Sequence, residues 1–336
     1  NSLLVNVSGQ VSLAPLAYAA PMLTSVNPAS SPTQGGVNVT LQGVNLGVGS
    51  VFELALTGPP PTTGGGAGAQ YCNHVWTQAD LGVSVFAYSH SKLWFLTPEG
   101  QCDAPMELTL TVAGQPSNAL SFRFDPPTIS MLSLDGSSGG TPLGEDCARS
   151  SSKGCSLETA GGYVVTVTGT NFGVDLQTLL FRGAPLESFS FVSHTEATFE
   201  VPAGTGAGIH VTAQVGSRSS SPSYFSYDPP WVTSFTPNEF DSNDDLIEIY
   251  GRNFGESVEA AGDDIRITIG NRTCGPVSVG ASETTLWQST VTGVPYLWCH
   301  LSGSTVGRKS LELFVAGQNL TRDAENSGIR GVCQSG

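Results

Sequence analysis

The sequence contains few charged residues and very little positive charge. Only 12% of the 336 residues are charged, and 13 basic residues against 28 acidic ones give a net charge of −15. The lysines number only three, and the arginines are scattered along the chain without forming a basic stripe. Such a surface repels polyanions, so we expect no nucleic acid among the partners of this protein.

The sequence also lacks the patterns of long helices. No window of about 11 residues repeats its apolar positions with a helical period, and no apolar run approaches the roughly 20 residues that span a bilayer. What is present is 39% hydrophobic residues with 41 glycines and 21 prolines, a composition typical of short strands joined by many turns. We therefore expect an all-β protein, with no membrane insertion within this segment.

Catalytic and metal-binding patterns are scarce as well. Residues 136–140 fit Gly-x-Ser-x-Gly, but they lie in a Ser/Gly-rich loop and not in the strand-to-helix turn that a nucleophile elbow requires. No Cys-x-x-Cys occurs, and the five histidines share no metal-ligand spacing. The sequence therefore predicts neither an enzyme nor a cofactor.

What the sequence does contain is a repeated turn. The pattern Gly-x-Asn-x-Gly occurs three times, at residues 43–47, 169–173 and 251–255. Each copy follows a stretch of alternating apolar residues, such as Val37, Val39 and Leu41 before the first turn. Glycine takes positive φ without a steric penalty and asparagine tolerates it, so we interpret these positions as structural. The recurrence indicates that one β-module has been copied.

Proline-containing junctions at residues 20–21, 125–127 and 228–230 set the boundaries of these modules. The predicted modules span residues 21–125, 126–228 and 229–336, which is about 100 residues each and fits three small cores. Because proline fixes its own φ and holds the preceding residue extended, the linkers should be short and stiff, and the array should be a semi-rigid rod.

The first 20 residues resemble the end of a module. Residues 5–10 are similar to residues 111–115 and 214–217, which precede the later junctions. We therefore expect residues 1–20 to be the closing strands of a truncated upstream module, and the chain to be part of a longer array.

These features together resemble the immunoglobulin-like, plexin, transcription-factor domain, known as TIG or IPT. The resemblance rests on residues 21–28 with Gly35 and Gly36, on Gly161 and Gly162, and on residues 231–237, each set followed by one of the three turns. It implies tandem immunoglobulin-like β-sandwiches of two antiparallel sheets each.

The third module further resembles the cysteine-paired form of this domain in fibrocystin-like and plexin-like ectodomains. The segments that carry this likeness are residues 267–274 and 297–299. The chain departs from the pattern where Asp244 and Asp245 replace the Gly-Gly pair, and where residues 135–160 form an insertion in the second module. The likeness implies an extracellular protein.

Cysteines are distributed evenly over the modules. The pairs are Cys72 with Cys102, Cys147 with Cys155, and Cys274 with Cys299. One pair per module favours local disulfides formed in an oxidising compartment. A bridge over the span from Cys274 to Cys299 would stabilise its module by about 3 kcal/mol. Cys333 is left over, and it either pairs outside this chain or is a free thiol.

Four Asn-x-Ser/Thr sequons begin at Asn6, Asn38, Asn271 and Asn319. Asn38 falls on the outward side of an alternating strand, where an N-linked glycan can be accommodated. Together with the cysteines, the sequons favour an extracellular or cell-surface location, for which a ciliary or flagellar surface is one setting.

One acidic segment is a candidate calcium site. Asp241, Asn243 and Asp245 place oxygen ligands at alternate positions, as a calcium loop does. Leu246 and Arg252 stand where an EF-hand requires glycine and a bidentate glutamate. The alternatives are a weak calcium site between modules and an acidic turn before a strand.

A group of aromatic residues in the first module is a candidate sugar-stacking platform or partner patch: Trp76, Phe86, Tyr88, Trp94 and Phe95. The apolar run from Leu93 to Leu96 makes Trp94 and Phe95 better suited to a core.

Two functions fit the sequence. The first is a non-catalytic structural or adhesive segment of a large extracellular or cell-surface glycoprotein. Such an array contacts other proteins or like modules, and homotypic contacts would build a filament or coat. The alternative is a set of carbohydrate-binding accessory modules of a secreted polysaccharide-processing enzyme, which requires exposed aromatic side chains.

Overall fold

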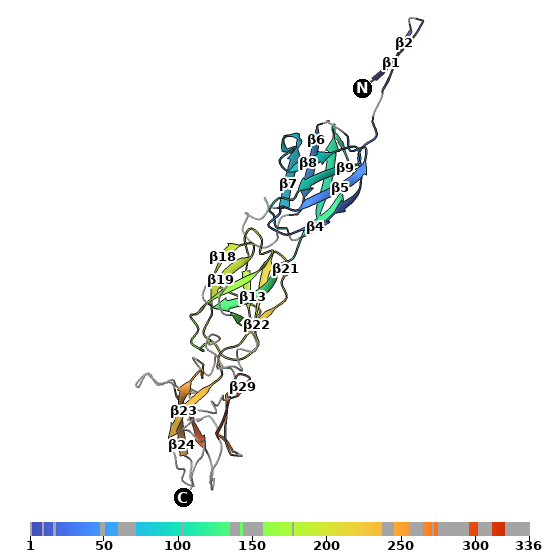
Figure 1. The fold of residues 1–336 in the computed structure, drawn as a ribbon. Coiled ribbons are helices and arrows are strands. Elements are labelled where there is room, and N and C mark those ends of the chain that lie inside the picture. Colours follow the sequence, from blue (N-terminus) through green and yellow to red (C-terminus); the bar gives the residue numbers. More distant parts are fainter. Residues whose placement is uncertain are drawn as a thin grey trace.

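The computed structural model shows a chain of β-sandwiches that follow one another along one axis, with an N-terminal hairpin beyond the first of them (Figure 1). We call the sandwiches module 1 (residues 21–125), module 2 (126–228) and module 3 (229–336). The structure describes residues 2–8, 10–15, 18–47, 51–59, 72–102, 104–134, 142–143, 157–176, 178–236, 245–255, 265–270, 272–274, 296–301 and 311–319.

The N-terminal hairpin consists of β1 (Ser2–Val7) and β2 (Gln10–Pro15), which pair antiparallel. Val7 faces Gln10 across a two-residue turn in which Ser8 has φ 52°. The hairpin forms a sheet of its own, and no third strand joins it among the described residues.

Module 1 consists of two sheets. The first has the order β3 (Met22–Asn27), β5 (Asn38–Val44), β9 (Lys92–Leu96) and β8 (Val85–Tyr88). The second has the order β4 (Ser30–Ser31), β12 (Leu120–Phe124), β10 (Met106–Val112), β6 (Phe52–Thr57) and β7 (Asn73–Thr77), with β11 (Gln115–Pro116) also on β10. The 3₁₀ turn η2 (Gln78–Asp80) follows β7 and is closed by a capping box from Thr77.

Module 2 repeats this plan. One sheet has the order β14 (Pro142–Leu143), β13 (Thr128–Leu134), β15 (Val164–Thr170), β19 (Glu196–Glu200) and β18 (Phe189–Ser193). The other has the order β17 (Ala184–Pro185), β16 (Thr178–Phe181), β20 (Ile209–Val215) and β21 (Arg218–Ser219), with β22 (Ser223–Phe225) also on β20.

Module 3 is described in fewer strands. One sheet has the order β23 (Trp231–Thr236), β24 (Asp245–Arg252) and β27 (Tyr296–Leu301). The other has the order β26 (Arg272–Cys274), β25 (Ile265–Ile269), β28 (Leu311–Val315) and β29 (Gln318–Asn319). The prediction of an all-β fold of tandem immunoglobulin-like sandwiches is therefore confirmed.

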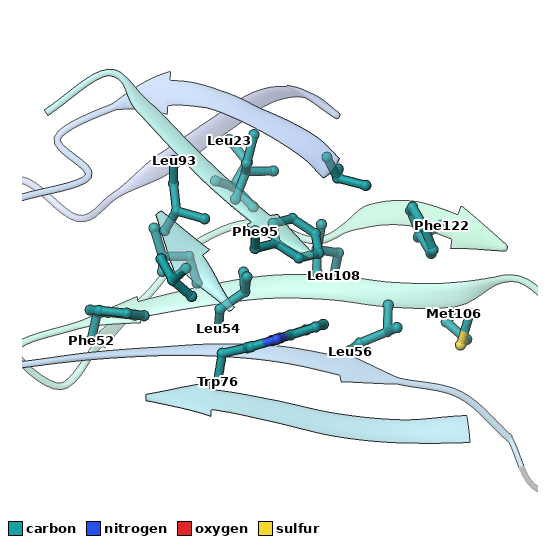
Figure 2. Packing of buried hydrophobic residues seen from close by; sticks show 14 of the residues in the cluster. Leu23, Phe52, Leu54, Leu56, Trp76, Leu93, Phe95, Met106, Leu108 and Phe122 are labelled. Atoms are coloured by element: carbon teal, nitrogen blue, oxygen red, sulfur yellow. The ribbon is translucent and has the colours of Figure 1, made fainter. Parts of the chain in front are cut away.

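Each module has its own hydrophobic core, because alternate residues of strands such as β5, β6, β10 and β20 point between its two sheets. In β5, Val39 and Leu41 are fully buried while Asn38 and Gln42 are exposed. Trp76 packs against Phe95 of the opposite sheet with ring centroids 4.8 Å apart, and both lie in the core of module 1 shown in Figure 2. Burying one such large side chain contributes about 1.5–3 kcal/mol.

The buried hydrophobic residues divide into three clusters. The first runs from Leu23 to Phe124, the second from Leu132 to Tyr227, and the third from Ile247 to Val315. Among the described residues no cluster crosses a proline junction, so there the modules contact each other without a shared apolar core.

Candidate functional site: the joints between modules

The first glycine of each repeated turn is required by close packing of the backbone. A Cβ atom on Gly169 would lie 1.9 Å from the carbonyl oxygen of Thr128, and one on Gly43 or Gly251 would lie 2.3 or 1.9 Å from the equivalent carbonyl. Nothing larger than glycine fits at these distances. The sequence predicted positive φ for this turn, but that holds for its asparagine and last glycine and not for its first glycine.

The asparagine of each turn forms a hydrogen bond with the linker that precedes its module. The three residues adopt left-handed backbone conformations with φ of 59°, 60° and 61°. Their side-chain amides donate to a linker carbonyl: Asn45 to Ala20 at 3.4 Å, Asn171 to Pro126 at 3.0 Å and Asn253 to Pro229 at 3.3 Å. The repeated turn is therefore also the point at which each module holds the chain that enters it.

The second turn also contacts the module before it. Gln101 of module 1 is only 2% exposed, and its side-chain oxygen accepts hydrogen bonds from the backbone N–H groups of Val174 and Asp175 at 3.1 and 3.3 Å. A Cβ on Gly173 would lie 2.0 Å from that oxygen. Gly173 has φ 80°, so both its backbone conformation and the contact favour glycine.

Thr33 of module 1 makes a second set of contacts with the same turn. Its backbone N–H donates to Asn171 Oδ1 at 3.2 Å, and its hydroxyl oxygen accepts from the N–H of Gly173 at 3.3 Å. The hydroxyl also lies 3.0 Å from Nδ1 of His194, whose Nε2 is 3.5 Å from a carboxylate oxygen of Glu99. Thr33 is 1% exposed, so its buried hydroxyl is satisfied within the joint, whereas the side chain of Glu99 is 52% exposed.

Arg218 completes the joint between modules 1 and 2. Its guanidinium donates to the backbone carbonyl of Phe124 and, at 2.6 Å, to the backbone carbonyl of Cys102. Hydrogen bonds from a charged donor are among the stronger ones in proteins. The joint is thus built from a buried amide, a buried hydroxyl and a guanidinium.

The joint between modules 2 and 3 uses the same positions. Gln318 of module 3 is 7% exposed, and its side-chain amide donates to the carbonyl of Tyr227 at 2.7 Å. Gln318 and Arg218 both follow the two-residue turn of the corresponding hairpin, pairing with Val315 and Val215. Tyr227, like Phe124, stands directly before Asp-Pro-Pro. One donor position and one acceptor position therefore recur in both joints.

Sequence reasoning did not identify these joint residues. Thr33, Gln101 and His194 lie outside the repeated motifs, and nothing in their local sequence marks them. A usable signal was present for Arg218 and Gln318, because a side chain with N–H donors stands at the same offset after each hairpin turn.

Among the predicted disulfides, the structure describes the first pair of cysteines best. Cys72 and Cys102 are both buried in the core of module 1. Both also border Gly58, since a Cβ there would lie 2.8 Å from Cys102 Sγ and 3.5 Å from the carbonyl oxygen of Cys72. The two residues therefore lie near each other; Cys72 Sγ donates to the carbonyl of Gln101 at 3.0 Å and Cys102 Sγ to the carbonyl of Pro59 at 3.3 Å, and their disulfide stays a prediction.

The other cysteines are described only in part. Cys274 lies in β26 and Cys299 in β27, two strands of different sheets that contact each other. Cys147, Cys155 and Cys333 lie outside the described residues.

The sequons are described unevenly. Asn6, Asn38 and Asn319 are exposed, and each begins or lies within a strand at the surface. Asn271 lies outside the described residues. Glycosylation of these positions stays a prediction.

The candidate calcium segment is described only at its end. Asp245 begins β24 and faces Leu301 of β27, while Asp241 and Asn243 lie outside the described residues. In the part of the chain that the structure describes, no group of three or more His, Cys, Asp or Glu side chains is arranged to hold a metal ion. Over the same residues, no helix is long and apolar enough to cross a membrane.

The aromatic group of module 1 does not form a platform. Trp76 and Phe95 are 1% exposed and belong to the core, and Tyr88 and Trp94 are partly buried. Phe86 alone of the five is largely exposed, at 51%. The alternation of the strands turns most of these rings inward, as expected for Phe95.

The geometry defines a class of protein: a linear array of immunoglobulin-like sandwiches joined by polar contacts. A family model described as the IPT/TIG domain matches residues 21–124, 153–227 and 230–327. The chain belongs to the IPT/TIG domain family. No curated protein matches it.

Among solved structures, similar folds occur in much longer proteins. The plexin A4 full extracellular region is 15% identical over 87% of this chain and 22% of its own, with a TM-score of 0.25. A protein crystallised with a xylogluco-oligosaccharide is 12% identical over 92% of this chain and 60% of its own, with a TM-score of 0.34. SGBP-B, from a xyloglucan utilization locus in Bacteroides uniformis, is 16% identical over 58% of this chain and 48% of its own, with a TM-score of 0.22. The chain thus spans less than two thirds of each of these proteins.

Proposed function

We propose that the chain is a non-catalytic structural or adhesive segment of a larger extracellular or cell-surface glycoprotein. It acts as a semi-rigid array that holds parts of that protein at a fixed spacing and contacts other proteins. The observation that carries this proposal is the burial of polar side chains at the joint between modules 1 and 2.

A flexible tether between domains needs no such contacts. Here the linker from β12 to β13 comprises residues 125–127 only, two of which are prolines. Gln101 and Thr33 are buried, and their hydrogen bonds to module 2 are directional. The modules are therefore held at a preferred angle, which is the property that a spacer needs.

The chemistry of the surface supports an extracellular setting. Asn6, Asn38 and Asn319 are exposed in their sequons, and Cys72 and Cys102 are placed at one site. N-linked glycans and disulfides both form in secreted proteins. A ciliary surface is one location of this kind, and homotypic filament or coat assembly is one use of the array.

The carbohydrate-binding alternative is less well supported. It requires exposed aromatic side chains on which a sugar stacks, and the described tryptophans Trp76, Trp94 and Trp231 are buried or partly buried. Binding to a polysaccharide on a glycan array would support this alternative.

Small-angle X-ray scattering of the purified chain tests whether the modules form a semi-rigid spacer. We expect an elongated particle whose scattering is fitted by one arrangement of the modules. Scattering that requires a broad ensemble of angles between modules would contradict the proposal. Sedimentation over a range of concentrations, a pull-down from extracellular extract and a glycan array on the same material then separate self-association, protein binding and sugar binding.

A further inference from the structure

The upstream end of module 1 carries the same groups that modules 2 and 3 use to dock on the module before them. We propose that this end is a docking surface for another sandwich of the same family, whose closing hairpin is β1 and β2. In this third joint, Gln115 donates to the backbone carbonyl of Tyr18, and Asn45 Oδ1 accepts from a backbone N–H of the upstream sandwich.

The donor position is fixed by the hairpin turns. Gln115 pairs with Val112 across a two-residue turn, as Arg218 pairs with Val215 and Gln318 with Val315. Arg218 and Gln318 each donate to the last carbonyl before a linker. Gln115 stands at the same place in module 1, and within the described residues its side chain makes no hydrogen bond.

The acceptor position is fixed by the first strand of each module. The carbonyls that face the first turn glycines belong to Met22, Thr128 and Trp231. Counting four residues back from each gives Tyr18, Phe124 and Tyr227. Phe124 and Tyr227 are the two observed acceptors, and Tyr18, which is 79% exposed, is the third member of the set.

The asparagine of the turn also differs between modules 2 and 3, which contact a preceding module, and module 1. Asn171 Oδ1 accepts from the N–H of Thr33 in the preceding module, and Asn253 is only 9% exposed. Asn45 is exposed, and within the described residues it uses only its amide N–H₂, toward Ala20. The corresponding atom in module 2, Asn171 Oδ1, accepts a hydrogen bond from the preceding module, so Asn45 Oδ1 is an acceptor of the same kind.

The N-terminal hairpin identifies the partner. Val7 faces Gln10 across a turn with Ser8 at φ 52°, which matches the turns at Ala113 with φ 48° and Ala316 with φ 45°. Those turns lie in the closing hairpins of modules 1 and 3. A two-stranded hairpin is marginally stable in water unless a larger sheet or core completes it. The hairpin lies beyond module 1 along the axis of the array, where an upstream sandwich belongs (Figure 1).

This inference rests on the proposed function, since it extends the array by one joint. If the third joint does not form, the two observed joints and the proposed spacer function still stand. If scattering shows a flexible array in solution, the proposed spacer function is overturned, and the third joint is decided by the hydrogen-exchange experiment below.

The test uses the natural polypeptide expressed together with the residues encoded before Asn1, compared with the 336-residue chain. We expect roughly 80 further residues with a Gly-x-Asn-x-Gly turn, from a period of about 100 residues per module. Hydrogen exchange is measured at residues 43–47 and 112–115. In the longer protein we expect these amides to exchange at least about tenfold more slowly.

Variants connect that protection to the named side chain. Gln115→Ala in the longer protein should restore most of the faster exchange, whereas Gln78→Ala, an exposed glutamine on η2, should not. An unchanged melting temperature shows that the variants are folded. The inference is overturned if the encoded upstream residues lack such a sandwich, if the exchange is the same in both proteins, or if Gln115→Ala has no effect.

Discussion

The guanidinium of Arg218 donates a hydrogen bond to the backbone carbonyl of Phe124, 94 residues earlier in the chain. Phe124 is the last residue of β12, and Arg218 is the first residue of β21, so the bond joins the end of one sandwich to the closing hairpin of the next. The angle between the two modules is therefore set by specific side chains as well as by the stiffness of a proline linker.

Removing this side chain should loosen the first joint. Arg218→Ala deletes the hydrogen bonds to Phe124 and Cys102, each worth about 1.5–3 kcal/mol for a charged donor, and leaves both carbonyls without that donor. We expect X-ray scattering to change from one arrangement to a range of angles between modules 1 and 2. Arg123→Ala is the matched control, because Arg123 is an exposed arginine on β12. Equal scattering from the two variants would contradict the assigned role.

Adding one methyl group to the turn of module 2 should have a related effect. Gly173→Ala places a Cβ 2.0 Å from Gln101 Oε1 and requires alanine at φ 80°. The backbone alone costs about 1–2 kcal/mol, and displacement of Gln101 adds to this. Gly82→Ala has nearly the same φ, 83°, with nothing within 4 Å, so it isolates the backbone cost. Chemical denaturation should give a larger loss for Gly173→Ala, and similar losses would remove Gln101 from the explanation.

The first glycine of the turn should be the least replaceable. Gly169→Ala forces a Cβ to within 1.9 Å of the carbonyl oxygen of Thr128, which is backbone and moves only with strand β13. We expect module 2 to lose about 3 kcal/mol or more of unfolding free energy. Gly162→Ala, whose nearest neighbour would lie at 3.9 Å but whose φ is 79°, serves as control and should lose only the backbone cost of about 1–2 kcal/mol. Thermal unfolding followed by circular dichroism measures both variants, and a mild effect at Gly169 would contradict the close approach.

The raised pKa of Tyr227 predicts how the free energy of unfolding depends on pH in the alkaline range. Burial raises the pKa of Tyr227 from 10.0 to about 12, with a smaller opposing effect of Arg182, and its hydroxyl donates to the carbonyl of Pro202 at 2.5 Å. Below pH 10 the side chain is neutral in both states, so its contribution is fully present. Between pH 10 and 12 the unfolded chain loses the proton first, and stability falls as pH rises.

Tyr227→Phe removes this titration. The variant should be less stable at neutral pH, where the hydrogen bond to Pro202 is lost, and its unfolding free energy should depend less on pH between 10 and 12 than that of the unchanged protein. Denaturation curves over that range provide the measurement. Parallel pH profiles of the two proteins would show that Tyr227 titrates no differently when folded.

The cysteines of module 1 give a covalent test. We expect peptide mass analysis without reductant to recover Cys72 linked to Cys102. Loss of the bridge in Cys72→Ser should lower the stability of module 1 by about 3 kcal/mol, as expected for a closed loop of about 30 residues. Cys102→Ser should behave in the same way, and reduction should have no further effect on either variant. Recovery of both residues as unmodified thiols from oxidising medium would refute the pairing.

The sandwich fold was predictable because its determinants are local and repeated. Alternation of residues such as Val39 and Leu41 reports the buried face of a strand, and the asparagine of the turn reports a left-handed backbone. The role of Gly169 was only half predictable. Its sequence position indicated a turn, but the contact with Thr128 depends on pairing with a strand about 40 residues earlier.

The roles of Gln101 and Thr33 in the first joint could not be predicted from local pattern. Gln101 and Thr33 are ordinary polar residues in loops, and the hydrogen-bond partners that they contact here lie in the next module. A polar side chain in a turn is normally solvated, so composition gives no reason to single them out. The aromatic platform failed for a related reason, since the alternation of β7 and β9 directs Trp76 and Phe95 into the core.

The bonds from Arg218 and Gln318 give the array a polarity. In each case the later module supplies the donor and the earlier module supplies the backbone carbonyl, so the two faces of a joint are different and cannot be exchanged. Head-to-tail contacts of this kind do not close into a symmetric pair. Because the acceptor of these two bonds is a main-chain carbonyl that every residue possesses, the bonds constrain the side chain of the following module and not that of the preceding one.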